Sequence, residues 1–139
     1  MEQRQRPITP NLWGPHGWKF IHYVTFGYPI QPTNQDKENY KMFFLSLQNI
    51  LPCSKCSENY KQNLKDYPID PALENRDSLI KWAIDIHNSV NKETNKSELD
   101  YDKAIQLYLQ DQTPYLDYCF KIVVLLCLLY FVYHCLKNK

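Results

Sequence analysis

Two cysteines placed three positions apart, Cys53 and Cys56 in the segment LPCSKC, are the residues of this sequence best suited to redox chemistry. They follow Pro52, and proline is favoured in the first turn of a helix, so we expect the pair at a helix N-terminus. The positive potential at that end of a helix favours a thiolate over a thiol. This spacing and setting are typical of a pair that opens and closes a disulfide.

Three other interpretations of this CxxC segment compete with electron transfer to a bound cofactor. A structural zinc site needs two further ligands, but residues 1–112 contain neither a second CxxC nor an HxxxH motif, so we expect no metal site. A thioredoxin-like enzyme would place the motif after a strand, whereas no segment here alternates in polarity as a strand does. Two inert buried cysteines are the last alternative, and the polar residues between them, Ser54 and Lys55, argue against deep burial.

The composition excludes several classes of function. The 139-residue chain has a net charge of +1 and no dense basic patch, so nucleic-acid binding is not expected. It contains only three glycines and neither a GxGxxG nor a GxxxxGK motif, which excludes a glycine-rich phosphate loop. A nucleotide cofactor would have to be bound by other means.

Apolar residues recur at helical spacing along most of the chain, and the expected fold is all-α. We predict a four-helix bundle with a short fifth helix. The expected helices lie at about residues 14–27, 34–51, 53–64, 75–91 and 101–110. Pro68 and Pro71 bracket a loop before the fourth helix. The polar residues 1–7 are predicted to form a disordered tail before a domain at residues 8–112.

The last part of the sequence is strongly apolar. Ile122–Tyr133 is a run of twelve apolar or aromatic residues without a charge, and its flanks extend the segment to residues 116–136. We predict a single C-terminal transmembrane helix there, after a linker at residues 113–115, because apolar residues occupy every face. This predicts localisation in a membrane, with the domain on the cytosolic side, or in a virion membrane. A buried core helix is the alternative.

Three segments of the sequence carry aromatic, polar and cysteine residues at a distinctive spacing: Gly14, Trp18, His22, Tyr28 and Pro29, then Pro52, Cys53 and Cys56, and then Trp82, His87, Asn88, Val90, Asn91 and Lys96. Together these residues resemble the pattern of Erv/ALR-type FAD-linked sulfhydryl oxidases. Their order and spacing agree over about residues 12–110. Three coincident motifs in one small helical chain are far more specific than any one of them alone.

The resemblance implies a four-helix bundle that holds FAD without a Rossmann fold. It also implies that Cys53 faces the thiol substrate and that Cys56 lies against the isoalloxazine ring. The residues that it assigns to FAD binding are Gly14, Trp18, His22, Tyr28, His87, Asn88, Asn91 and Lys96. Such enzymes oxidise protein dithiols and pass the electrons to O₂, which becomes hydrogen peroxide, and they are commonly homodimers.

The chemistry of these residues fits a flat aromatic cofactor. Trp18 and His22 are one helical turn apart, so both can face the same ring. His87, Asn88 and Asn91 form a polar cluster on an otherwise apolar helix, which could pair with the edge of a purine. Each residue also has an ordinary role, as a core tryptophan, a hydrogen-bonded core histidine or part of a helix C-terminus. Only the combination favours a cofactor site.

The sequence departs from the family pattern in three places. Asp100 and Tyr101 stand where cellular members often have a cysteine that staples the fifth helix, so packing must hold that helix here. Thr94 and Asn95 replace the usual Leu and Gly before Lys96. The N-terminal tail has no cysteine, so electrons arrive directly from a protein dithiol or, as we favour, through a separate dithiol relay protein.

A chain with one CxxC and no staple looks like the viral members of this family. The main alternative from another class is a membrane-anchored helical interaction module whose CxxC is structural. The two hypotheses predict different absorption spectra for the purified protein, because a flavoprotein absorbs visible light and the interaction module does not.

Overall fold

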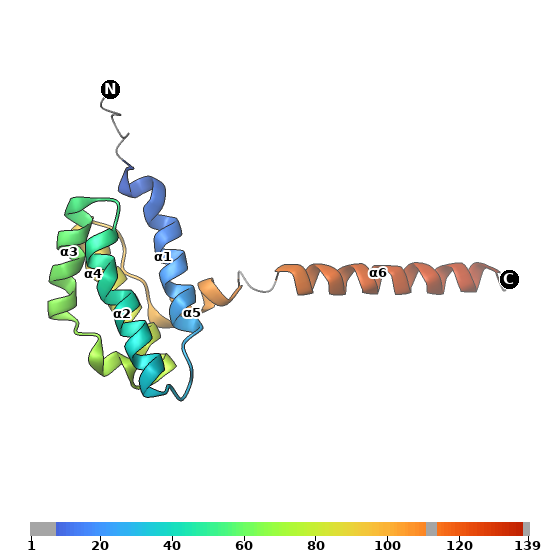
Figure 1. Cartoon of the computed structure of the whole chain (residues 1–139). Coiled ribbons are helices and arrows are strands. Elements are labelled where there is room, and N and C mark those ends of the chain that lie inside the picture. Colours follow the sequence, from blue (N-terminus) through green and yellow to red (C-terminus); the bar gives the residue numbers. More distant parts are fainter. Residues whose placement is uncertain (1–7, 111–113, 138–139) are drawn as a thin grey trace, which may run out of the picture. The chain divides into compact units, whose positions relative to one another are not determined.

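The computed structural model describes residues 8–110 and 114–137, and within them every regular element is a helix (Figure 1). The helices are α1 Pro10–Phe26, α2 Asn34–Ile50, α3 Ser54–Asp66, the 3-10 helix η1 Asp70–Glu74, α4 Arg76–Glu93, α5 Tyr101–Gln110 and α6 Pro114–Lys137. The chain divides into two compact units, residues 1–104 and 105–139. The all-helical prediction is confirmed for the described residues, and the bounds of α2 to α5 agree with it within two residues.

The starts of α1 and α2 follow from residues that cap a helix. α1 begins at Pro10, earlier than its apolar pattern predicts, and Pro15, expected in the first turn, lies inside the helix. Pro10 is accommodated because the first N–H groups of a helix have no partner within it. At α2, the Thr33 hydroxyl accepts a hydrogen bond from the Asp36 amide at 3.2 Å, and the Asp36 carboxylate accepts one from the Thr33 amide at 2.8 Å. This capping box fixes the first turn of α2.

The core of the first unit lies where α1, α2, α4 and η1 meet. Phe44 of α2 is fully buried and contacts Trp82 of α4 edge to face, with 5.0 Å between ring centroids. The Trp82 indole N–H donates to the Tyr67 carbonyl at 2.9 Å, so its polar atom is satisfied within the core. η1, where the sequence predicts a loop between two prolines, buries Ala72 and Leu73 against the same core.

α1 and α4 run antiparallel. Arg76, at the start of α4, donates from Nε to the carbonyl of Tyr28, just after the end of α1. Further along α4, His87 meets His22 in the middle part of α1. Residues later in α4 therefore contact residues earlier in α1, as in an antiparallel helix pair.

α3 is also antiparallel to α4. The Ser89 hydroxyl donates to Asn63 at 3.0 Å, and Asn59, one turn earlier in α3, donates to Glu93 at the end of α4. These two antiparallel pairs place the first turns of α1 and α3 at the end of the bundle where α4 finishes (Figure 1).

The C-terminus of α4 is closed by a Schellman motif. The Lys96 amide donates to the Asn91 carbonyl at 2.8 Å, and the Asn95 amide donates to the Lys92 carbonyl at 3.2 Å. Asn95 has φ = 54°, in the left-handed region where glycine is most favoured and asparagine is tolerated. The left-handed Asn95 thus makes the turn that ends α4, and it fixes where the chain leaves the helix.

The prediction of a C-terminal transmembrane helix at residues 116–136 is wrong, and so is the single-pass membrane localisation derived from it. α6 forms, but none of the described helices is long and apolar enough to cross a membrane. The physical reason is that only the twelve residues Ile122–Tyr133 form an uninterrupted apolar run, whereas a span needs about 20. Lys121 and His134 end the run on either side. The tail predicted at residues 1–7 lies outside the described residues.

The left-handed residue at the end of α4 yields a test of stability. Asn95→Ala should lower the free energy of unfolding by about 1 kcal/mol, because alanine is strained in this conformation. Asn95→Gly should leave that free energy unchanged or slightly raised. Urea unfolding followed by circular dichroism measures both. Equal losses in the two variants would contradict a role for backbone conformation at this position.

Candidate active site

The two cysteines form a disulfide at the start of α3, with their Cα atoms 5.1 Å apart. Cys53 is the N-cap of the helix, and its Sγ accepts a hydrogen bond from the Cys56 amide at 3.2 Å. Both cysteines are half-buried, while Ser54 and Lys55 between them are exposed. No group of three metal-binding side chains occurs within the described part of the chain. The pair is therefore accessible for thiol exchange and is held where a helix terminus stabilises negative charge.

An aromatic and imidazole cluster joins α1 to α4. The Trp18 ring stacks on the His87 ring, with centroids 4.0 Å apart and planes 6° from parallel. His22, which is fully buried, places Nε2 3.0 Å from Nδ1 of His87, so that a hydrogen bond links the two imidazoles. Residues 65 positions apart in the sequence thus meet as one surface, which we call the imidazole cluster: Trp18, His22 and His87.

Both imidazoles of the cluster are poor bases. The pKa of His22 falls to about 3, mainly because burial disfavours the imidazolium and also because His87 lies beside it. The pKa of His87 falls to about 4, mainly through burial and further through the positive charge of Lys96. Both rings are consequently neutral at pH 7, and each neutral ring has one nitrogen that donates and one that accepts a hydrogen bond.

Three further predicted residues lie around the imidazole cluster. Lys96 is exposed, its amide is bonded to the Asn91 carbonyl one turn after His87, and its positive charge contributes to the low pKa of that ring. Asn91, one turn after His87 on α4, is buried. Gly14, one turn before Trp18 on α1, has open space where a Cβ would lie, with no other heavy atom within 4 Å of that position. An aromatic face, neutral imidazoles, a cation and an open helix surface can accommodate a flat ligand with an anionic part.

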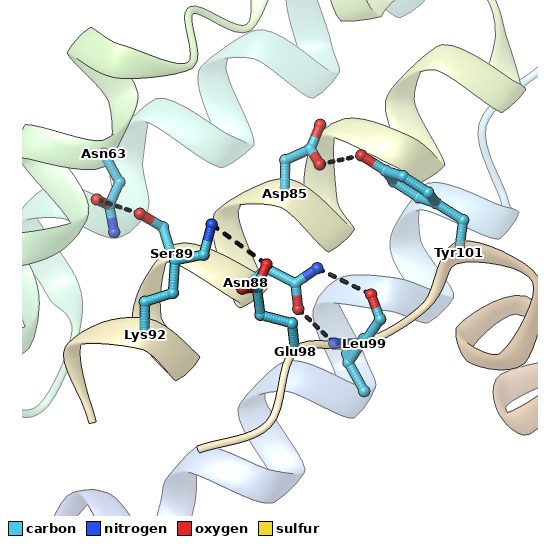
Figure 2. A network of polar contacts seen from close by, with 8 residues as sticks. All are labelled: Asn63, Asp85, Asn88, Ser89, Lys92, Glu98, Leu99 and Tyr101. Carbon is cyan, nitrogen blue, oxygen red and sulfur yellow. Dashed lines mark hydrogen bonds and ion pairs between the residues drawn. The ribbon is translucent and has the colours of Figure 1, made fainter. Parts of the chain in front are cut away.

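Two predicted site residues are engaged elsewhere. Tyr28 is fully buried, and its hydroxyl donates to the Leu73 carbonyl at 2.8 Å, so it helps to join the end of α1 to η1. Asn88 directs its carboxamide to the backbone of Leu99, which follows α4 (Figure 2). The sequence does not reveal that Leu99 is the partner of Asn88, because Leu99 makes this contact through its backbone atoms, which are the same in every residue type.

The disulfide and the open side of the imidazole cluster belong to the same end of the bundle. Gly14 is in the first half of α1, Cys53 caps α3, and Lys96 follows α4, so the antiparallel pairing of α1 and α3 with α4 brings these positions toward the end where α4 finishes. On α3, Cys56 is followed at helical spacing by Asn59 and Asn63, which both bond to α4. Cys56 therefore lies on the face of α3 that is turned toward α4.

Comparison with known proteins identifies the relatives of this chain. The Erv1 / Alr family model matches residues 15–110. The chain is 47% identical over 108 residues to a probable FAD-linked sulfhydryl oxidase of Acanthamoeba polyphaga mimivirus, and the match covers 77% of this chain and 76% of the relative. It is 33% identical over 87 residues to the mitochondrial FAD-linked sulfhydryl oxidase ERV1 of Saccharomyces cerevisiae, covering 63% of this chain and 45% of the yeast protein.

A solved structure shares the fold. The crystal structure of the yeast Erv1 core superposes with a TM-score of 0.68 at 28% sequence identity, and the match covers 78% of this chain and 90% of that one. The chain thus spans less than half of the length of the yeast protein but most of its core.

The low basicity of His22 makes stability depend on pH. In the unfolded chain this imidazole takes up a proton near pH 6.5, whereas in the folded protein it does so only near pH 3. Between these values the unfolded state binds more protons, so stability falls as pH decreases. His22→Asn should remove this contribution and flatten the slope by up to about 1.4 kcal/mol per pH unit between pH 6 and 4.

Urea unfolding of the flavin-free protein at a series of pH values measures this slope. Above pH 7 the curves for the wild-type protein and the variant should run parallel. An unchanged slope below pH 6 would show that His22 is not kept neutral by burial.

Proposed function

The chain belongs to the Erv1/Alr family, and we propose that it is an FAD-linked sulfhydryl oxidase that forms disulfide bonds in protein substrates. The observation that carries the proposal is the pairing, in one small helical unit, of a disulfide at a helix N-terminus with a stacked aromatic and imidazole surface. The disulfide is not explained by stability alone, because it joins residues only three positions apart and so closes a very short loop.

The residues of the site fit FAD. Trp18 and His87 offer flat ring faces, and the half-buried His87 imidazole, held by His22, offers a hydrogen bond to a polar ring edge. The Lys96 ammonium suits a pyrophosphate, and the open surface at Gly14 lets a ligand approach α1 closely. When bound, FAD would accept two electrons from the reduced cysteine pair and pass them to O₂, which becomes hydrogen peroxide.

The exchange chemistry begins at the exposed side of the disulfide. A substrate thiolate attacks Sγ of Cys53, the Cys53–Cys56 bond breaks, and Cys56 leaves as a thiolate. A second thiolate of the substrate then attacks the substrate sulfur of the mixed disulfide and releases Cys53 as a thiolate. The substrate dithiol is thereby oxidised to a disulfide, the CxxC pair is reduced, and two protons pass to solvent.

The local structure supports different roles for the two cysteines. Cys53 is the residue that receives the Cys56 amide hydrogen bond, so its thiolate is stabilised when it is released. Cys56 lies on the face of α3 turned toward α4, which carries His87. Cys53 therefore exchanges with substrate thiols, and Cys56 is the cysteine beside the cofactor.

The partners follow from this chemistry. The electron donor is a protein dithiol, presented by the substrate itself or by a dithiol relay protein, and the electron acceptor is O₂. We further propose a homodimer through α1 and α2, which is supported by large apolar side chains that these helices expose, such as Phe20 at 58% and Met42 at 60%.

Substitution of the cysteines separates cofactor binding from turnover. The purified full chain should be yellow and should consume oxygen when given a dithiol. Cys56→Ser and Cys53→Ser should retain the flavin absorbance and lose more than about 99% of the oxygen consumption, because one sulfur cannot carry the exchange. Cys119→Ser, which removes a free cysteine of α6, should behave as the wild-type protein. Turnover that survives in Cys56→Ser would contradict the proposed roles.

The imidazole cluster should set the affinity for FAD. Trp18→Ala and His87→Ala should each weaken FAD binding by about tenfold or more, since each removes a stacking surface of ~1–3 kcal/mol. Titration of flavin-free protein with FAD, followed by quenching of flavin fluorescence, measures the affinity. His16→Ala, an exposed histidine of α1, is the matched control and should not change it. Wild-type affinity in both cluster variants would place the cofactor elsewhere.

A further inference from the structure

The chain that leaves α4 is tied back onto that helix by side chains of α4. Asn88 bonds to Leu99, Lys92 forms an ion pair with Glu98 at 3.2 Å, and Asp85 accepts a hydrogen bond from the Tyr101 hydroxyl (Figure 2). These contacts lie along successive turns of α4, so residues 98–101 run antiparallel to α4, toward its N-terminus.

Asn88 makes the strongest of these ties. Its Oδ1 accepts from the Leu99 amide at 2.7 Å, and its Nδ2 donates to the Leu99 carbonyl at 2.9 Å. Asn88 is only 9% exposed, so these bonds are shielded from water and costly to leave unmade. The ion pair of Lys92 and Glu98 is 60% and 54% exposed, and exposed pairs contribute little.

The Asn88 tie and the Schellman motif together close a short loop around Lys96. At one end the Lys96 amide is bonded to the Asn91 carbonyl, and at the other end, three residues later, Leu99 is bonded to Asn88. Both ends are therefore fixed to the same two turns of α4 that carry His87. The loop has little freedom, so it keeps the Lys96 side chain near that ring.

We propose that Asn88 is a positioning residue that binds no cofactor itself: it holds the loop 95–99 so that the Lys96 ammonium stays beside His87 and attracts an anionic group of FAD. The inference rests on the proposed function and reassigns Asn88 within it. It agrees with the direction of the Asn88 carboxamide, which faces the backbone of Leu99 (Figure 2). The bond from the Lys96 amide to the Asn91 carbonyl places the Lys96 backbone one turn of α4 beyond His87, and the Lys96 charge contributes to the low pKa of that ring.

A double-mutant cycle on the full flavin-free chain tests this inference. Asn88→Ala and Lys96→Ala should each weaken FAD binding by about tenfold, the order of one hydrogen bond to a charged group. The double variant should bind no more weakly than Lys96→Ala alone, because Asn88 acts through Lys96. Added salt should weaken the affinity of the wild-type protein, by screening the Lys96 charge, more than that of either single variant.

Two controls separate positioning from general destabilisation. Ser89→Ala, on the next position of the same helix, breaks the hydrogen bond to Asn63 between α4 and α3 and should leave both the FAD affinity and its salt dependence unchanged. Hydrogen exchange of the Leu99 amide in flavin-free protein should be slow in the wild-type chain and fast in the Asn88 variant. If Asn88→Ala does not fold, Asn88→Ser, which keeps a small polar side chain, takes its place in the cycle.

The outcomes are distinct. Additive losses in the double variant, or a wild-type salt dependence in Asn88→Ala, would overturn the positioning role while leaving the oxidase proposal intact. A wild-type chain that binds no FAD would overturn both. Non-additive losses with a flattened salt dependence support the inference.

Discussion

The contact on which the structure depends is the hydrogen bond between two neutral imidazoles, the fully buried His22 and the half-buried His87, that joins α1 to α4. A proton on His22 would be buried beside a second imidazole, and a proton on His87 would be partly buried and repelled by the charge of Lys96, so the pKa of each ring is lowered. The contact also helps to fix the register of the two helices, since the same His87 imidazole is bonded to His22 and stacked on the Trp18 ring one turn earlier in α1. The polar surface of the site and the alignment of the bundle are thus one feature.

The site divides its chemical requirements between two environments. The sulfur pair caps a helix and is half-buried, as exchange with an incoming thiolate requires. The imidazole cluster is anchored by His22, which is fully buried, so its hydrogen bond to His87 is partly shielded from water. α4 links these environments, because it carries His87 on the side that meets α1 and Ser89 on the side that meets α3. One helix therefore positions both the cluster and the helix that carries the disulfide.

Much of this arrangement could be predicted from local spacing, and the parts that could not depend on distant partners. The i, i+4 spacing of Trp18 and His22 correctly places both on the face of α1 that meets α4. Tyr28 could not be placed in this way, because its partner is the carbonyl of Leu73, 45 residues away. Asn88 could not be placed either, because its partner is the backbone of Leu99. The sequence does not point to η1, because Pro71 within it and Pro68 before it are typical of loop boundaries. Apolar character on all faces of α6 predicts a membrane span, but its uninterrupted apolar run of twelve residues is too short for one.

The meeting of α1 with α4 across 65 residues has a consequence for how the protein is made. As the polypeptide leaves the ribosome, α1 is synthesised first and stays without its counterpart until nearly the whole helical unit has emerged. Neither half of the imidazole cluster exists on its own, because Trp18 and His22 come from α1 and His87 comes from α4. The cluster can therefore assemble only once α4 has been translated, late in the synthesis of the helical unit.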